Sequence, residues 1–227
     1  MSKLTKQELK PRKIKNERYT NLKLTMESIQ NFIVRNKDIY EKVSEVPKEL
    51  IAKYETILPQ ELIYIWKTMG FGIYEDGYLQ IINPEEWDFV FQYIDKILEP
   101  SVVIGITALG DLLVWEGNDN WTIAPDEGNR LAFFNLRSMS KKIQGELHYY
   151  LKFRVKMTSF LEEEYNAKPY LQMKDKLPKL AYGQCYGYVP TLPLGGKQSN
   201  KNLKVVDAKA YINLIGEAVG KIYGLED

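Results

Sequence analysis

The chain has 227 residues, a formal net charge of +1 and the composition of an ordinary globular protein, with 44% hydrophobic and 27% charged residues. It contains one cysteine, Cys185, and one histidine, His148, which excludes an internal disulfide and the common zinc sites, so we expect neither a metal nor a cofactor. Because histidine is the side chain best suited to proton transfer near neutral pH, its scarcity argues against an enzyme, and we predict no catalytic residues.

The N-terminal segment differs in charge from the rest of the chain. Residues 1–23 contain eight basic and two acidic residues and carry +6, whereas the remaining 204 residues contain 23 basic and 28 acidic residues and carry −5. We predict a basic, disordered tail over residues 1–27, with a short amphipathic helix that binds nucleic acid, a membrane or a partner as the alternative. Residues 1–20 contain no apolar run and no later run reaches the 18 residues of a membrane span, so we expect a cytoplasmic protein that does not bind membranes.

Helices dominate the predicted elements of the first half. Pro47 and Pro59 each open a helix, and Gly70 ends the second one. Asn83 is expected to cap an amphipathic helix of about thirteen residues that closes before Pro100. The patterns predict helices over residues 26–40, 48–56, 60–69 and 84–97, and a strand over residues 77–82.

The second half begins with a predicted β-meander, in which two apolar runs flank a turn at Leu109–Gly110–Asp111. The segment 181–196 is rich in Gly, Pro and Tyr but interleaved with apolar residues, so we expect an irregular segment that packs against the body. The remaining patterns predict strands over 102–107, 112–115, 121–123 and 131–134, and helices over 138–151, 158–166 and 207–223. The chain is therefore expected to adopt an α+β fold with a mixed or antiparallel sheet flanked by helices.

Short motifs for catalysis or phosphate binding are incomplete. Gly195–Gly196–Lys197 resembles part of a phosphate-binding loop, but that pattern needs glycine at Thr191 and Ser or Thr at Gln198. Cys185 has no basic neighbour in sequence that would lower its pKa, which favours a buried structural thiol. A lone His148 without Cys or carboxylate at ligand spacing favours a packing or surface residue.

Acidic residues cluster at predicted turns and helix starts, where a solvated or capping role is the interpretation that we favour. A carboxylate pair of the glycosidase type stays open, because its two members can be distant in the chain. Should the clusters bind a partner, a negative surface for a positively charged protein fits best, and turn residues are expected to be exposed. The predicted partner-binding residues are Glu75, Asp76, Glu116, Asp119, Asp126 and Glu127.

Two stretches resemble bacterial protein families. Residues from about 46 to 92 resemble the GAD-like domain in the order of their features, from VPKELIAKY and ILPQEL through Trp66, the GFG triplet and Asn83–Pro84. Residues from about 103 to 216 resemble the C-terminal domain of Tdi-type immunity proteins of type VI secretion systems, in TALGDLLVWEG and YGYVPTLPLGG. The helix–Gly–strand–hairpin layout is also distantly similar to the SUKH immunity superfamily.

The resemblance implies a two-part protein that binds and neutralises a cognate toxin, which is a DNase in the Tdi-type case, without catalytic residues and without nucleic-acid contacts of its globular body. The parts would be a GAD-like region over residues 28–100 and a Tdi-type region over 101–227, packed as one compact unit. Two alternatives stay open. The first is a nucleic-acid-associated regulatory protein that uses the basic tail, and the second is an enzyme with two buried acids in one cleft.

Overall fold

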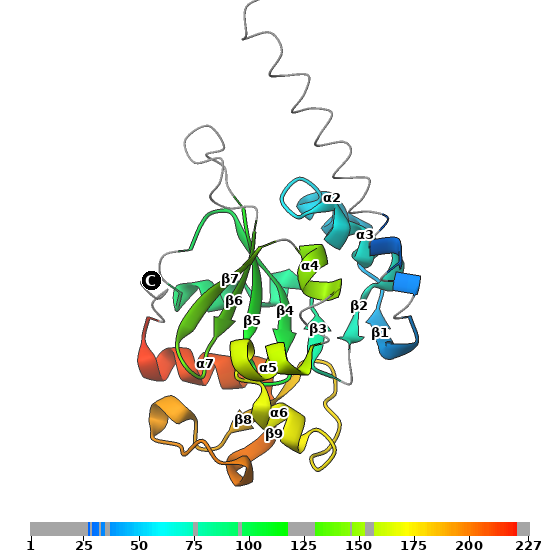
Figure 1. Cartoon of the computed structure of the whole chain (residues 1–227). Coiled ribbons are helices and arrows are strands. Elements are labelled where there is room, and N and C mark those ends of the chain that lie inside the picture. Colours follow the sequence, from blue (N-terminus) through cyan, green and yellow to red (C-terminus); the bar gives the residue numbers. More distant parts are fainter. Residues whose placement is uncertain are drawn as a thin grey trace, which may run out of the picture.

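A seven-stranded antiparallel sheet forms the centre of the computed structural model (Figure 1). The structure describes residues 27, 29–31, 33–34, 37–74, 77–94, 97–117, 130–145, 147–152 and 157–221. The strands follow one another across the sheet in chain order, and each is antiparallel to its neighbours. They are β1 (Tyr40–Ser44), β2 (Phe71–Tyr74), β3 (Leu79–Ile81), β4 (Ser101–Thr107), β5 (Leu112–Glu116), β6 (Arg130–Asn135) and β7 (Ser140–Gly145).

A separate two-stranded antiparallel sheet is formed by β8 (Gln184–Tyr188) and β9 (Leu203–Asp207). The α-helices are α2 (Lys48–Tyr54), α3 (Gln60–Met69), α4 (Leu147–Lys152), α5 (Thr158–Tyr165), α6 (Lys168–Met173) and α7 (Ala208–Val219). The short 3-10 helices are η1 (Lys37–Ile39), η2 (Pro84–Glu86), η3 (Asp88–Gln92), η5 (Leu192–Leu194) and η6 (Asn200–Asn202).

Strands β2 to β6 are buried on both faces of the central sheet, whereas most residues of the edge strands β1 and β7 are exposed or only partly buried. Successive side chains of a strand point to opposite sides, so a strand that is buried on both faces can contribute to two cores. On β5, Leu113 and Trp115 join the core formed with α2 to α6, whereas Leu112 and Val114 join the core formed with η2, η3 and α7. The strands β4 and β6 divide their side chains in the same way. This burial on both faces explains why the central strands read as continuous apolar runs rather than as alternating ones.

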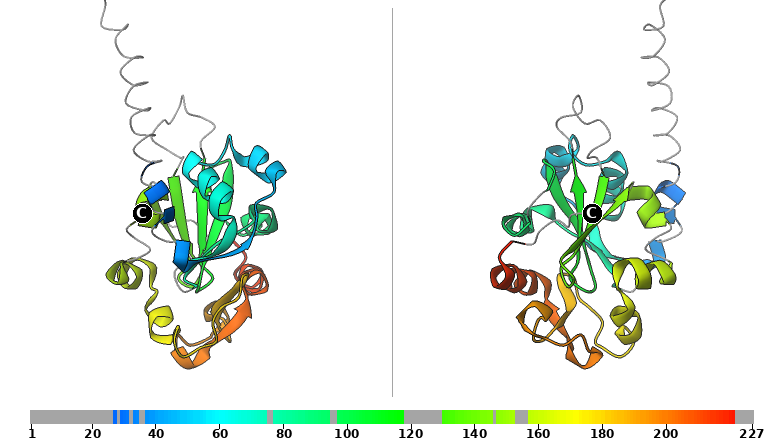
Figure 2. Two further views of the ribbon diagram at one scale, coloured as in Figure 1. Left: turned by 90° about the vertical axis from the view of Figure 1, so that its right-hand side faces the viewer. Right: turned by 60° about the vertical axis from the view of Figure 1, so that its left-hand side comes forward.

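The small sheet and α7 lie at the end of the molecule that is farthest from α2 and α3 (Figures 1 and 2). Gln80, which is fully buried on β3, anchors this end to the central sheet. Its side-chain amide Nε2 donates to the carbonyl of Gln184 at 2.8 Å, and its Oε1 accepts a hydrogen bond from the backbone N–H of Gly183 at 2.7 Å. The two sheets therefore share one hydrogen-bonded framework.

The predicted α+β fold is confirmed, and its sheet is antiparallel. The predicted helices at 48–56, 60–69, 158–166 and 207–223 and the strands at 77–82, 102–107, 112–115 and 131–134 appear as α2, α3, α5, α7 and β3 to β6. The helix α3 leads directly into β2 through Gly70, which has a positive φ of 76°. A Cβ there would lie 2.2 Å from the carbonyl oxygen of Ser44, so only glycine permits this close approach of β1.

Several element predictions are wrong. The predicted helix over 26–40 does not reach its expected end, because Tyr40 is the first residue of β1. The predicted helix over 84–97 is instead the pair η2 and η3, whose tighter turn of three residues aligns Trp87 and Val90 on the sheet. The first half of the predicted helix over 138–151 is the edge strand β7, whose backbone pairs with β6 although its side chains are largely polar. Strands β2, β8 and β9 and helix α6 were not predicted.

The domain division at residue 100 stays a prediction. That position lies between β3 and β4, which are paired in one sheet, so the two parts share a core rather than meeting at a linker. Residues 1–26, which include nearly all of the predicted tail, and the predicted strand at 121–123 lie outside the described residues. Among the residues described, no helix has both the length and the apolar character needed to cross a bilayer.

Candidate functional site

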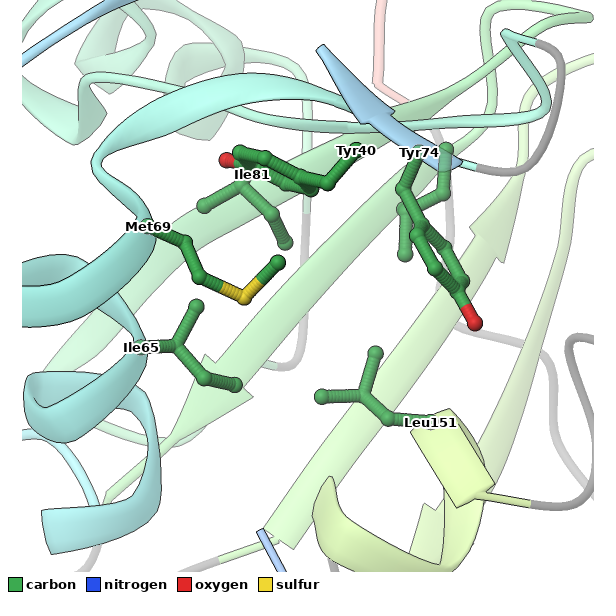
Figure 3. A pocket seen from close by; sticks show the side chains of 7 residues that line it. Tyr40, Ile65, Met69, Tyr74, Ile81 and Leu151 are labelled. Carbon is green, nitrogen blue, oxygen red and sulfur yellow. The ribbon is translucent and has the colours of Figure 1, made fainter. Parts of the chain in front are cut away.

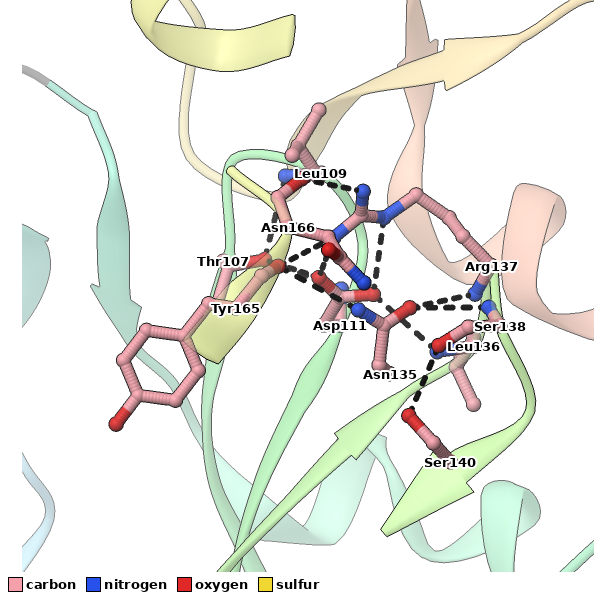
Figure 4. A network of polar contacts seen from close by, with 10 residues as sticks. All are labelled: Thr107, Leu109, Asp111, Asn135, Leu136, Arg137, Ser138, Ser140, Tyr165 and Asn166. Atoms are coloured by element: carbon pink, nitrogen blue, oxygen red, sulfur yellow. Dashed lines mark hydrogen bonds and ion pairs between the residues drawn. The ribbon is translucent and has the colours of Figure 1, made fainter. Parts of the chain in front are cut away.

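A buried polar network joins the two halves of the sequence (Figure 4). Asp111 lies in the turn between β4 and β5, and Arg137 lies in the turn between β6 and β7. The guanidinium donates from Nη2 to Asp111 Oδ2 at 2.6 Å and from Nε to Oδ1 at 3.3 Å, and the two side chains are 4% and 1% exposed. The same guanidinium donates to the carbonyls of Tyr165 and Asn166, both at 2.9 Å, at the C-terminal end of α5.

The network encloses the Asp111 carboxyl in a buried site. Burial raises the pKa of the Asp111 carboxyl, while the charge of Arg137 and hydrogen bonds from Arg137, Leu136 and Thr107 oppose that rise. The turn that carries Asp111 also contacts β8, because the carbonyl of Ala108 accepts the N–H of Tyr186 at 2.7 Å. The motif TALGD, singled out from sequence, is thus a structural junction between the sheet, α5 and β8.

Glu116, the one predicted partner-binding residue that the structure describes, is buried rather than exposed. It ends β5, and its carboxylate accepts a hydrogen bond from Arg130 Nε at 3.1 Å and a further one from Lys141. The expectation of an exposed turn residue is wrong here because Arg130, which lies opposite Glu116 on β6, and Lys141 of β7 both reach its carboxylate. The other five, Glu75, Asp76, Asp119, Asp126 and Glu127, lie outside the described residues and stay predictions.

The two fully buried carboxylates of the described residues do not form a catalytic pair. Asp111 precedes β5 and Glu116 ends it, so the rise of a strand separates them by roughly 17 Å. Each is engaged by basic side chains, Asp111 by Arg137 and Glu116 by Arg130 and Lys141. This arrangement removes the geometric basis of the carboxylate-enzyme alternative in the described part of the chain.

A small cavity lies between α3, α4 and strands β1 to β3 (Figure 3). Its side chains are apolar apart from two tyrosines, Tyr40 and Tyr74, and its volume is about 10 Å³. The hydroxyl of Tyr40 donates to the carbonyl of Gly70 at 2.8 Å. A space of this size holds at most one water molecule, so the cavity is a packing defect rather than a ligand site.

A larger pocket, of about 350 Å³, opens between α7, η5 and the ends of β8 and β9. Its loop is built by the sequence YGYVPTLPLGG, which leaves β8 at Tyr188 and returns through η5. The N–H of Tyr188 donates to the hydroxyl of Tyr211 at 3.0 Å, which fixes the loop against α7. Six aliphatic residues provide most of the lining, namely Val189, Pro190, Leu194, Val206, Ala210 and Leu214.

The rim of this pocket is apolar and exposed. Val189, Leu194 and Leu214 are 49%, 52% and 46% exposed, and all three line the same pocket rather than lying singly on the surface. The polar lining includes Asp207, whose Oδ1 caps α7 by accepting the N–H of Ala210 at 2.8 Å. A concave apolar pocket with an exposed aliphatic rim is the arrangement expected of a protein-binding surface.

Charge is distributed unevenly over the fold, which the average over the globular body concealed. Residues 37–117 contain 15 acidic and 6 basic residues and carry −9, whereas residues 168–209 contain eight lysines and two aspartates and carry +6. The second segment includes α6, β8 and β9 and supplies most of the residues that line the pocket, and α7 supplies the others. The uneven charge can be counted from the sequence, but only the fold shows that the basic segment supplies most of the pocket lining.

Cys185 has the environment expected of a structural thiol. It is buried on β8, and burial raises the pKa of its thiol. The side chain of His148 lies outside the described residues.

Comparisons with known proteins agree with the resemblance inferred from sequence. Residues 27–125 match the GAD-like domain, and residues 144–218 match the T6SS immunity protein Tdi1, C-terminal. The predicted order of the two regions is confirmed, and the GAD-like match extends through β5. A comparison with curated proteins gives no match.

The fold is shared with a solved structure. The crystal structure of Atu4351 from Agrobacterium tumefaciens superposes with a TM-score of 0.67 over 82% of this chain and 87% of that chain, at 22% sequence identity. At this identity the likeness supports the α+β fold. The match to an immunity-protein domain covers α4 to α7 and therefore includes the pocket.

Proposed function

We propose that this protein is an immunity protein that binds a cognate bacterial toxin in a stoichiometric complex and thereby neutralises it. The observation that carries this proposal is the exposed apolar pocket, which lies within the region that matches the T6SS immunity domain. Such a surface is costly to leave in water and is suited to a protein partner. Immunity proteins of this kind are generally not enzymes, and we propose that this chain acts by binding alone.

A nuclease is the toxin class that we favour, with a DNase as the example from the resembling family. A nuclease presents a basic surface to nucleic acid, and residues 37–117 carry −9. The predicted acidic contacts, with Glu116 omitted because it is buried, remain part of this proposal. We further propose that the protein acts in the cytoplasm, where such a toxin would reach nucleic acid.

The proposal is tested by co-expression with candidate toxins taken from the genes that neighbour the gene for this chain. We expect growth to be restored and a complex of defined stoichiometry to elute in size-exclusion chromatography with light scattering. A toxin of the same enzymatic class from an unrelated system serves as the control and should not be neutralised. Continued growth arrest together with the absence of a complex would contradict the proposal.

A second candidate is a nucleic-acid-associated regulatory protein, which the +6 charge of residues 1–23 favours. Its affinity for DNA or RNA would fall steeply with salt and would be lost on removal of residues 1–23. The immunity function predicts instead that this truncated protein still protects against the toxin. Nucleic-acid binding that requires residues 1–23, together with no protection by the full chain, would favour the second candidate.

A further inference from the structure

We propose that the pocket between α7, η5 and the β8–β9 sheet receives an apolar side chain carried by an acidic segment of the toxin. This inference rests on the proposed function and adds the chemistry of the partner segment. It also reverses the charge expected from sequence, because it places the docking contact on the basic end of the protein rather than on an acidic face.

The shape and lining of the pocket account for the apolar part of the partner. Its volume of about 350 Å³ accommodates a large aliphatic or aromatic side chain together with part of the adjoining backbone. Leu194 of η5 and Leu214 of α7 stand on opposite elements of the rim and are each about half exposed. Apolar surface thus continues outward from the pocket, which suits the central anchor of a protein interface.

Three lysines account for the acidic part of the partner. Lys204 lies on β9 two residues before Val206 and therefore on the same face of the strand as this pocket residue. Lys201 precedes Asn202, whose carbonyl accepts the N–H of Val189 at 2.9 Å. Lys197 follows Gly196, whose N–H donates to the carbonyl of Thr191 at 2.9 Å.

These lysines are free to bind an external anion. Lys197, Lys201 and Lys204 are exposed and form no ion pair with any residue that the structure describes. Asp207 is the acidic residue in the pocket lining, and its carboxylate accepts the N–H of Ala210 at the N-terminus of α7. The local field at the rim is therefore positive and would attract carboxylates of a partner.

The same surface is poorly suited to nucleic acid. Residues 168–214 contain no arginine, although arginine is the preferred side chain for phosphate and base contacts. The two aromatic side chains of the pocket, Tyr188 and Tyr211, are at most 5% exposed and offer no face on which a base could stack. An aliphatic pocket with lysines at its rim fits an acidic, apolar protein segment better.

This assignment has a consequence for the mode of inhibition. An acidic segment is not the part of a nuclease that binds nucleic acid, which is basic. The docking contact would therefore lie outside the nucleic-acid cleft of such a toxin. Neutralisation would then occur because the bound protein sterically blocks access to the cleft, or because its acidic segment 37–117 reaches the cleft.

The test measures, by biolayer interferometry, the affinity of the full chain for the candidate toxin of the co-expression experiment, in a catalytically inactive form. The pocket variant carries Leu194→Asp and Leu214→Asp, and its control carries Val43→Asp on β1, which is 46% exposed and far from the pocket. We expect the pocket variant to lose at least about 30-fold in affinity, as for an interface anchor, and the control to bind like wild type. Unchanged thermal melting would show that both variants fold.

The charge variant carries Lys197→Glu, Lys201→Glu and Lys204→Glu. Its control makes the same change in net charge at three exposed lysines of the acidic segment 37–117, with Lys37→Glu, Lys48→Glu and Lys67→Glu. We expect the charge variant to lose about 10-fold in affinity, mainly through a slower association rate, and to lose most of the salt dependence. The control should bind as tightly as wild type.

The outcomes separate this inference from the proposed function. If wild type binds the toxin and both test variants bind equally well, the docking site is wrong while the immunity function stands. If wild type does not bind the toxin, the proposed immunity function and the docking site are both wrong. If wild type binds a short DNA duplex of random sequence and the charge variant alone releases it, the lysines serve nucleic acid and the inference is overturned.

Discussion

Substitution of Arg137 tests whether the buried network holds the fold together. Arg137→Met keeps most of the side-chain volume but removes the cation from Asp111, which is 1% exposed, and the donors from two carbonyls. Breaking a buried, hydrogen-bonded ion pair leaves an uncompensated charge and costs about 3–5 kcal/mol in the free energy of unfolding. In urea unfolding this loss would lower the midpoint by roughly 1 M or more.

A matched control lies on the neighbouring strands. Arg130→Met removes one cation from Glu116, but Lys141 remains and the Arg130 side chain is already 28% exposed, so we expect a loss of about 1 kcal/mol. Adding Asp111→Asn to Arg137→Met should recover about 1–3 kcal/mol relative to the sum of the single changes. The reasoning is refuted if Arg137→Met costs no more than Arg130→Met, or if the double-mutant cycle is additive.

Three further predictions concern the small sheet and α7. Burial raises the pKa of the Cys185 thiol, and it raises the pKa of the Tyr211 hydroxyl to about 12. The stability that these two neutral groups contribute is therefore complete below about pH 8 and declines as rising pH ionises the unfolded chain first. Urea unfolding from pH 7 to 10.5 should show this decline, and the thiol should react with a chromogenic disulfide reagent only on unfolding. Gly187→Ala would place a Cβ 2.7 Å from the Tyr211 ring and 2.8 Å from Val206, so calorimetry should show a loss of roughly 1–3 kcal/mol, and an unchanged melting temperature would argue against this packing. Asp207→Ala removes the cap of α7 and should cost about 1 kcal/mol, whereas Asp207→Asn should retain most of that stability.

Much of the fold followed from local patterns, and the failures have identifiable causes. The helix α3 has a proline before it, an acidic first turn and a terminal glycine, so its limits were predicted to the residue. The strand β7 carries lysines and glutamine because it is the edge of the sheet, and an edge strand does not need an apolar pattern. The strand β8 was missed because Gly187 interrupts its pattern, and the short strand β9 was missed because its adjacent valines do not alternate with polar residues.

The candidate site was less accessible to sequence reasoning. Acidic residues at turns were expected to be exposed, yet Glu116 is enclosed by cations from two strands that follow it in the chain. The pocket depends on Tyr188, Leu194 and Leu214 meeting from β8, η5 and α7, and no spacing in the sequence predicts that meeting. The motif YGYVPTLPLGG marked the right segment, but only as part of a resemblance.

By itself, the sequence determined the α+β class, the antiparallel meander at its centre and the order of the GAD-like and immunity-type regions, because these depend on local periodicity, on capping and turn residues and on an ordered set of motifs. Only the tertiary structure decided which charges are neutralised and which are offered to a partner. Asp111 and Glu116 are buried in ion pairs with arginine and lysine. Lys197, Lys201 and Lys204 beside the pocket are exposed and form no ion pair with a residue that the structure describes. The physical reason is that the pairing and solvation of a charge depend on residues brought together across the fold, which the linear order of the chain does not specify.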